Sequence, residues 1–302
     1  MQKITPCLWF NDQLEEAVNF YISAFKNGQI FQTARYDEAG AKAAGRPAGS
    51  VMTMTFELLG HKFMGLNGGP HFKFNPSVSF FVNFDPSKNT SAKENQTALW
   101  QKLSENGKVL MPLDTYPFSK HYGWVQDKYG VSWQLILSNP DGDLRPDILP
   151  SFMFVNANCG KAEEAAEFYV SVFKDSERGI IARYPAGMEP DKEGTVMYTD
   201  FMIENYWIAS MDSAQKHDFA FNEAVSFVIN CNSQEEIDYY WDKLLAIPQQ
   251  CGWLKDKYGL SWQIVPKNMG ELLSGKDKEK SKRAMQAMLQ MKKIDIKTLE
   301  NA

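Results

Sequence analysis

Hydroxyl and amide side chains recur at matching positions in two halves of the chain. Ser132 and Gln134 close the run GWVQDKYGVSWQLI, and Ser261 and Gln263 close GWLKDKYGLSWQIV, 129 residues later, with nine of fourteen positions identical. Alternate residues of a strand point to the same face, so each Ser lies beside its Gln. Such groups donate and accept hydrogen bonds, so they can orient a small molecule in an apolar pocket.

A second pair of runs carries the same kind of side chain. PSVSFFVNF and EAVSFVINC are short apolar segments in which Ser and Asn also share one face. Together the two pairs of runs give eight candidate ligand-binding residues: Ser79, Asn83, Ser132, Gln134, Ser226, Asn230, Ser261 and Gln263. The alternative is that these side chains satisfy one another inside a filled core, as most buried polar groups do.

Other reactive residues show no recognised catalytic spacing. The four cysteines form no CxxC pair, and we expect them to be reduced thiols packed as small apolar groups. The four histidines (His61, His71, His121 and His217) form no HxxxH arrangement and are expected at the surface or in loops. No nucleophile elbow, P-loop or GxGxxG turn is present. Trp124, Trp133, Trp253 and Trp262 are predicted to serve first in packing and second as pocket walls.

The composition is that of a globular protein. The chain has 302 residues, 44% of them hydrophobic, which favours two domains of about 150 residues each. The net charge of −5 argues against nucleic-acid binding. The sequence has no signal-peptide pattern and no apolar run long enough to span a bilayer, so we expect a cytoplasmic protein that does not bind membranes.

The internal repeat defines the predicted organisation. Each copy has the pattern strand, helix, three strands, then strand, helix and two or three strands, so the chain holds four βαβββ modules. We place one domain at 1–143, a second at 144–270 and a helical tail at 271–302, with a linker at Asn139–Pro150. Capping boxes are predicted to open three helices, at Asp12, Ser91 and Ser233.

Paired βαβββ modules with this closing motif resemble the vicinal oxygen chelate superfamily, the group of glyoxalases, bleomycin-resistance proteins and extradiol dioxygenases. Three segments are similar to its PhnB-like branch, which is often labelled 3-demethylubiquinone-9 3-methyltransferase: EEAAEFYVSVF, CGWLKDKYGLSWQIVP and RAMQAMLQMKKIDIKTLENA. The resemblance implies an α+β fold of tandem glyoxalase-like domains. In such a fold, paired modules form eight-stranded, cupped mixed sheets, and the proteins commonly form dimers.

The resemblance also implies where a metal would lie. Enzymes of the superfamily hold a divalent metal in the cup on His, Gln and Glu side chains. The last ligand of those enzymes is a Glu, and Gln134 and Gln263 occupy the corresponding positions in this chain. The other ligand positions fall near Thr5, Pro150, Ser77 and Ala224. This set lacks the hard or imidazole ligands that such a site needs, so we predict no metal. No glycine-rich turn is present to hold S-adenosylmethionine, so the sequence does not support the methyltransferase label.

Three functions remain open at this point. The first is a metal-free protein that binds a small organic molecule in each cup, with Gln134 or Gln263 at the centre and a homodimer as one expected assembly. The second is a lyase, isomerase or dioxygenase-type enzyme that uses Mg, Zn or Fe. The third is an assembly module whose Met-bearing tail docks a partner. The sequence leaves open whether the strands pair within one copy or between copies.

Overall fold

The computed structural model describes residues 2–36, 38, 40, 41, 45–275 and 277–302. Its strands form two eight-stranded sheets, which we call sheet A and sheet B. Sheet A has the order β14-β15-β16-β13-β1-β4-β3-β2, and sheet B has the order β10-β11-β12-β9-β5-β8-β7-β6. Parallel and antiparallel pairs occur in both, which confirms the predicted α+β class with mixed sheets.

The elements follow the four predicted modules. The first holds β1 (Ile4–Phe10), α1 (Leu14–Phe25), β2 (Gly28–Arg35), β3 (Val51–Leu58) and β4 (His61–Asn67). The second holds β5 (Val78–Phe84), α3 (Ala92–Ser104), β6 (Lys108–Tyr116), β7 (Ser119–Gln126) and β8 (Ser132–Leu137). The third holds β9 (Ile148–Val155), α4 (Ala162–Val172), β10 (Glu177–Arg183), β11 (Val196–Ile203) and β12 (Tyr206–Ser213). The fourth holds β13 (Val225–Cys231), α5 (Gln234–Leu244), β14 (Ile247–Pro248), β15 (Trp253–Lys255) and β16 (Ser261–Pro266).

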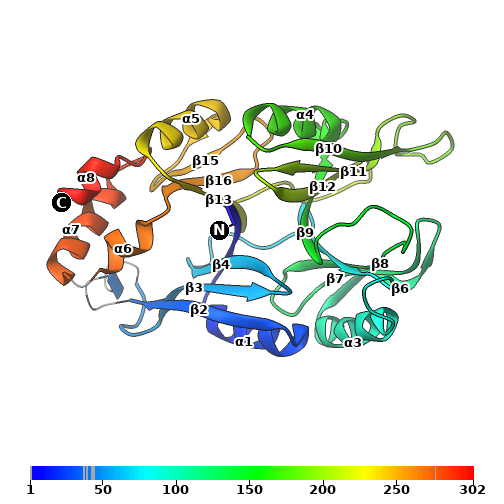
Figure 1. Ribbon diagram of the computed structural model, residues 1–302, viewed down its shortest axis with the longest axis horizontal. Helices are drawn as coiled ribbons and strands as arrows, with labels where there is room; N and C mark the ends of the chain where they lie inside the picture. The colour runs from blue at the N-terminus through cyan, green and yellow to red at the C-terminus, as the bar shows by residue number, and fades with distance from the viewer. Residues whose placement is uncertain (1, 37, 39, 42–44, 276) are drawn as a thin grey trace.

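Each sheet is shared between the two repeats. Sheet A joins the first module to the fourth through β1 and β13, and sheet B joins the second to the third through β5 and β9. In Figure 1 the first repeat forms the lower half and the second repeat the upper half, with sheet A on the left and sheet B on the right. The strands therefore pair between copies. Whether 1–143 and 144–270 fold as separate domains stays a prediction.

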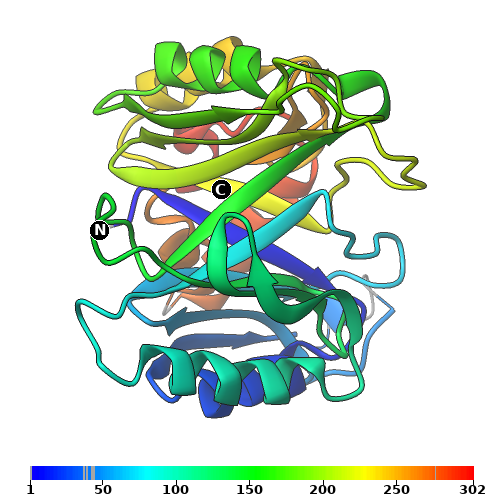
Figure 2. The same ribbon diagram turned by 90° about the vertical axis from the view of Figure 1, so that its right-hand side faces the viewer.

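The helices cover the outer faces of both sheets, and the largest core lies beneath them. Figure 2 shows helices at the top and bottom with the strands between them. Trp133 and Trp262 face this core and are fully buried, which confirms their predicted packing role. Trp124 and Trp253 are only partly buried. No helix in the described ranges is long and apolar enough to cross a membrane.

The linker ends before Ile148 and not at Pro150 as predicted. Ile148, Leu149 and Pro150 belong to β9, which is buried along its whole length. Pro150 is tolerated in a central strand because the ladder with β12 begins only at the next residue, Ser151. A missing N–H there costs no ladder hydrogen bond. Pro6 occupies the same position in β1, whose ladder with β4 begins at Cys7.

Two of the three predicted capping boxes are wrong. Helix α1 has Gln13 at its N-cap, and its first N–H, that of Leu14, is taken instead by the side chain of Asn67 from β4. Ser91 stands at the N-cap of α3 without a side-chain capping bond. Ser233 does cap α5, where its hydroxyl accepts from Glu236 N at 3.4 Å.

The tail packs against the second repeat and lies beside sheet A (Figure 1). It comprises α6 (Met269–Ser274), α7 (Lys278–Leu289) and α8 (Ile296–Glu300). Ala284, Ile294 and Leu299 are buried. The carbonyl groups of Met291 and Lys292 accept hydrogen bonds from the main chain of the second repeat. The apolar stripe of α7 thus packs partly on its own chain, although Leu289 remains 49% exposed.

A buried aspartate in each repeat ties one sheet to a helix that covers the other. Asp127, in the β7–β8 turn of sheet B, accepts from Tyr21 of α1 at 2.7 Å and from Trp133 Nε1 at 2.9 Å. Its second oxygen accepts from the main-chain N–H groups of Tyr129 and Val131. Asp256 makes the same four bonds in the second repeat. The repeated DKYG…W motif is therefore explained by this bridge.

A second link between the sheets lies where the β3–β4 and β11–β12 hairpins meet. His61 Nε2 and the Tyr206 hydroxyl lie 2.9 Å apart, and both side chains are buried. The prediction that His61 lies at the surface is wrong, because this pairing gives the imidazole a polar partner inside the protein. Burial lowers the pKa of His61 to about 3, although a main-chain hydrogen bond with Ile148 opposes the change.

Asp127→Ala should lower the free energy of unfolding by about 3 kcal/mol, because it leaves four buried donors without an acceptor. Chemical denaturation followed by circular dichroism measures this. Asp141→Ala, at an exposed linker position, is the control and should change stability by under about 0.5 kcal/mol. A loss below about 1 kcal/mol for Asp127→Ala would contradict the bridge.

His61 should make stability depend on pH. Its folded pKa lies below the unfolded value, so acidification through about pH 6.5 charges the unfolded chain first and favours unfolding until about pH 3. Each pH unit in this window costs about 1.4 kcal/mol per proton. Between pH 6 and 4, the wild type should therefore lose about 2 to 3 kcal/mol more than His61→Gln. Parallel pH profiles for the two proteins would refute the assignment.

Candidate ligand-binding cups

The face of sheet B that points away from its helices carries an aromatic cluster. We call this face cup B. Phe81, Tyr122, Leu149 and Ala209 form its buried part, and the partly buried apolar residues around them are Met111, Tyr116, Trp124, Ile136, Tyr198, Trp207 and Met211. These side chains come from β5, β6, β7, β8, β9, β11 and β12, so both repeats build the cup.

Gln134 lies at the centre of cup B in a fixed orientation. Its Nε2 donates to Ser79 Oγ at 2.8 Å, and its Oε1 accepts from the Tyr122 hydroxyl at 2.5 Å. Burial raises the pKa of Tyr122, with a smaller contribution from Tyr116, so the phenol keeps its proton for this bond. The candidate residues Ser79 and Gln134 are thus brought together in the mutual hydrogen bond that the filled-core alternative expected, and Tyr122 is a member of the set that the sequence analysis missed.

A third hydroxyl beside this pair has no partner. Ser151 of β9 lies directly opposite Ser79 of β5, and the two are Cα partners in the ladder. Ser151 is 1% exposed, and its Oγ makes no hydrogen bond to any residue that the structure describes. A buried unpaired hydroxyl costs free energy, so a molecule that supplied a partner here would gain affinity.

The other predicted residues of cup B have separate partners. Ser132 Oγ accepts from Trp124 Nε1 at 2.8 Å, which holds the indole against the cup. Asn83 lies at the end of β5, where its Nδ2 donates to the carbonyl of Pro146 at 2.7 Å. Asn83 therefore fastens the linker and is not part of the central Gln134 network.

Cup B also holds an ion pair that the sequence analysis missed. Arg145, from the linker, donates to Asp200 through Nε at 2.7 Å and through Nη2 at 3.3 Å. Its guanidinium lies 3.9 Å from the ring centre of Trp207. Asp200 is 1% exposed and also accepts from Ile180 N. A charged residue in the apolar strand YTDFMI was the signal that could have revealed it.

The corresponding face of sheet A, which we call cup A, repeats the central pair with one substitution. Gln263 Nε2 donates to Ser226 Oγ at 2.9 Å. Cys7 stands opposite Ser226, at the position that Ser151 occupies in cup B. Burial raises the pKa of the Cys7 thiol to about 12, against the effect of hydrogen bonds from Gln263 and Ser226. The thiol is therefore protonated at neutral pH. All four cysteines are free, as predicted.

The start of the tail packs on the apolar face of cup A. Met269, the first residue of α6, packs on the apolar cluster of Cys7, Val228 and Val265. Trp253 turns toward Trp9 at a ring-centre distance of 6.0 Å, and the buried Oγ of Ser261 is left without a partner in the described chain. Asn230 donates to the carbonyl of Lys3 at 3.4 Å, at the cup's edge.

The residues of the cups do not fit a metal site. Within the described ranges, no three His, Cys, Asp or Glu side chains converge. Gln134 and Gln263 bind neighbouring hydroxyl groups, and Pro150 lies on the helix-facing side of β9, one residue from Ser151. That the cups work without a metal stays a prediction. Two surface pockets, with volumes of about 490 and 550 Å³, include none of the eight predicted Ser, Asn and Gln residues in their linings.

Comparison with known proteins identifies the family. A family model described as 3-demethylubiquinone-9 3-methyltransferase matches residues 2–136 and again 146–265. The chain belongs to this family. A PhnB protein from Bacillus cereus, described by the same name, is 42% identical over 45% of this chain and 100% of its own, with a TM-score of 0.40. No curated protein matches the chain.

A more distant structure shares the fold over most of this PhnB-like chain. Glyoxalase I from Zea mays is 12% identical, covers 87% of this chain and 92% of its own, and gives a TM-score of 0.51. The PhnB-like chain thus has the tandem glyoxalase-like fold that its sequence predicted. At this identity the likeness concerns the fold alone.

Arg145→Ala should lower the free energy of unfolding by about 3 kcal/mol, because it leaves the buried carboxylate of Asp200 without its cation. Denaturant titration measures the change. Arg35→Ala removes an ion pair with Glu15 in which both side chains are 49% exposed, so it should cost under about 1 kcal/mol. Equal losses for the two variants would show that the cup B pair has no special role.

Proposed function

We propose that this PhnB-like protein binds a small, partly aromatic organic molecule in cup B without a metal. The observation that supports it most directly is the unpaired Ser151 hydroxyl beside the Gln134–Ser79 pair, inside an aromatic wall. A pocket of this kind gains affinity from apolar contact and orientation from a few polar groups. Ser151 would bond a polar atom of the ligand, while Tyr122 and Trp124 would contact its ring.

Cup A is the weaker candidate of the two. It retains the pair of Gln263 and Ser226 and has an unpaired hydroxyl at Ser261, but Cys7 stands where cup B has Ser151, and Met269 packs on its apolar cluster. A thiol is a poor hydrogen-bonding group compared with a hydroxyl. We therefore assign Ser79, Ser132, Gln134 and Ser151 to ligand binding and the corresponding residues of cup A to packing beneath the tail.

The proposal makes opposite predictions for stability and for binding at Ser151. Ser151→Ala should raise the free energy of unfolding by about 1 kcal/mol, because it removes an unsatisfied buried hydroxyl. It should weaken binding of N-phenyl-1-naphthylamine, a neutral fluorescent aromatic amine, about tenfold, because the ligand loses a hydrogen bond. Fluorescence titration measures affinity, and denaturation measures stability.

Ser210→Ala is the matched control. Ser210 Oγ is also buried and unpaired, but the residue lies between Ala209 and Met211 on β12 and so points to the helix-facing side. This variant should gain stability without losing affinity. If Ser151→Ala binds the amine as tightly as the wild type does, the proposal fails. A fall in melting temperature with EDTA would instead favour the metal-dependent lyase, isomerase or dioxygenase alternative.

A further inference from the structure

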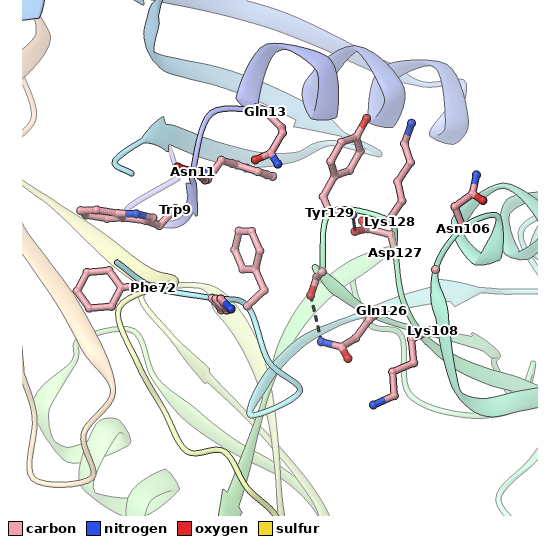
Figure 3. Close-up of a pocket in the computed structure, with 15 residues that line it drawn as sticks. Trp9, Asn11, Gln13, Phe72, Asn106, Lys108, Gln126, Asp127, Lys128 and Tyr129 are labelled. Carbon is pink, nitrogen blue, oxygen red and sulfur yellow. Dashed lines mark hydrogen bonds between the residues drawn. The ribbon is translucent and has the colours of Figure 1, made fainter. Parts of the chain in front are cut away.

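One surface pocket lies at the junction of the two modules of the first repeat, away from the Gln134 network of cup B. It has a volume of about 490 Å³ and is formed by the end of β1, the segment before β5, the β7–β8 turn and the end of α3. Figure 3 shows Trp9 and Phe72 on one side of it and Gln126, Lys108 and Asn106 on the other. The proposed function uses none of these residues.

In the second repeat, side-chain hydrogen bonds join the corresponding segments. Asn158, in a short insertion before α4, donates to the carbonyl of Tyr258 at 2.7 Å, and Asn156 donates to that of Phe219 at 2.8 Å. Tyr129, the counterpart of Tyr258, receives no such bond within the described part of the first repeat. The segments around the pocket therefore differ from their counterparts in the hydrogen bonds that join them.

The polar lining of the pocket is cationic. Lys73 and Lys108 are exposed and make no ion pair in the ranges that the structure describes, whereas Lys128 is held by Glu16. The single acid, Asp127, is buried and directs both oxygens to four internal donors. The repeat positions of Lys73 and Lys108 are Ala220 and Ile247 in the second repeat, so the charge is specific to the open pocket.

Flat aromatic surfaces face the same space. Trp9 and Phe72 meet edge to face, with ring centres 4.9 Å apart, and Trp9 Nε1 is fixed by the carbonyl of Gly69. Phe74 packs on Phe10 at 5.1 Å. Trp9, Phe72 and Phe74 are each only partly buried, so ring surface remains for contact with a ligand.

We propose that this pocket binds a small aromatic carboxylate, with its ring against Trp9 and Phe72 and its charge near Lys73 and Lys108. The exposed rings favour an aromatic ligand, and the unpaired lysines favour an anion over a neutral molecule or a cation. The site is independent of cup B, so each proposal can fail without the other.

The test uses 2-naphthoate as the probe and the full-length protein in isothermal titration calorimetry. The wild type should bind 2-naphthoate, and Lys73→Gln/Lys108→Gln should weaken it at least tenfold. The neutral 2-naphthamide should bind the wild type at least tenfold more weakly than 2-naphthoate does, and this affinity should not change in the double variant. Lys192→Gln/Lys216→Gln removes the same charge from exposed positions outside the pocket and should leave naphthoate affinity unchanged.

Three results would overturn the proposal. These are no binding of 2-naphthoate by the wild type, equal affinity of wild type and Lys73→Gln/Lys108→Gln, and equal affinity for 2-naphthoate and its amide. Ser151→Ala separates the two sites, because it should not alter naphthoate binding. A loss of naphthoate affinity in that variant would place the anion in cup B instead.

Discussion

The buried bond between Tyr21 and Asp127, with its counterpart between Tyr169 and Asp256, is the interaction on which this architecture depends. The two modules of each repeat belong to different sheets, so no β-ladder joins them. Each aspartate fastens a turn of one sheet to the helix that covers the other, while its second oxygen holds the turn itself. The two modules of one repeat are joined by this bond. Their strands β1 and β5 therefore pair with β13 and β9 of the other repeat, which completes both sheets.

Once the cups are built from both repeats, small sequence differences make them unequal. Cup B has the longer β6–β7 hairpin, the Arg145–Asp200 pair and a free hydroxyl at Ser151. Cup A has the short strands β14 and β15, the thiol of Cys7 and the intruding Met269. Under the proposed function, the duplicated fold keeps one cup for a ligand, while Met269 at the start of the tail packs on the other.

Local patterns predicted the fold well because strand alternation, helix periodicity and the repeat depend on nearby residues. The same alternation placed Ser79 and Gln134 on the predicted faces of their strands, and the structure adds the hydrogen bond between them. The sequence marked Asp200 as unusual in an apolar strand, but it could not show that its partner is Arg145, which lies 55 residues away in the linker. It also misplaced His61, since a buried imidazole needs a partner such as Tyr206, which only the meeting of two hairpins supplies. The capping box predicted at Asp12 is absent for a similar reason: the N–H of Leu14 donates to Asn67 of β4.

The central claim is that cup B, and not cup A, is the ligand site of this PhnB-like protein. A crystal structure of the full chain with N-phenyl-1-naphthylamine tests it most directly. The account predicts density for the amine in cup B, with its nitrogen within hydrogen-bond distance of Ser151 Oγ and its rings against Tyr122 and Trp124. Density in cup A alone, or a cup B whose side chains close on Ser151 with no ligand present, would contradict it.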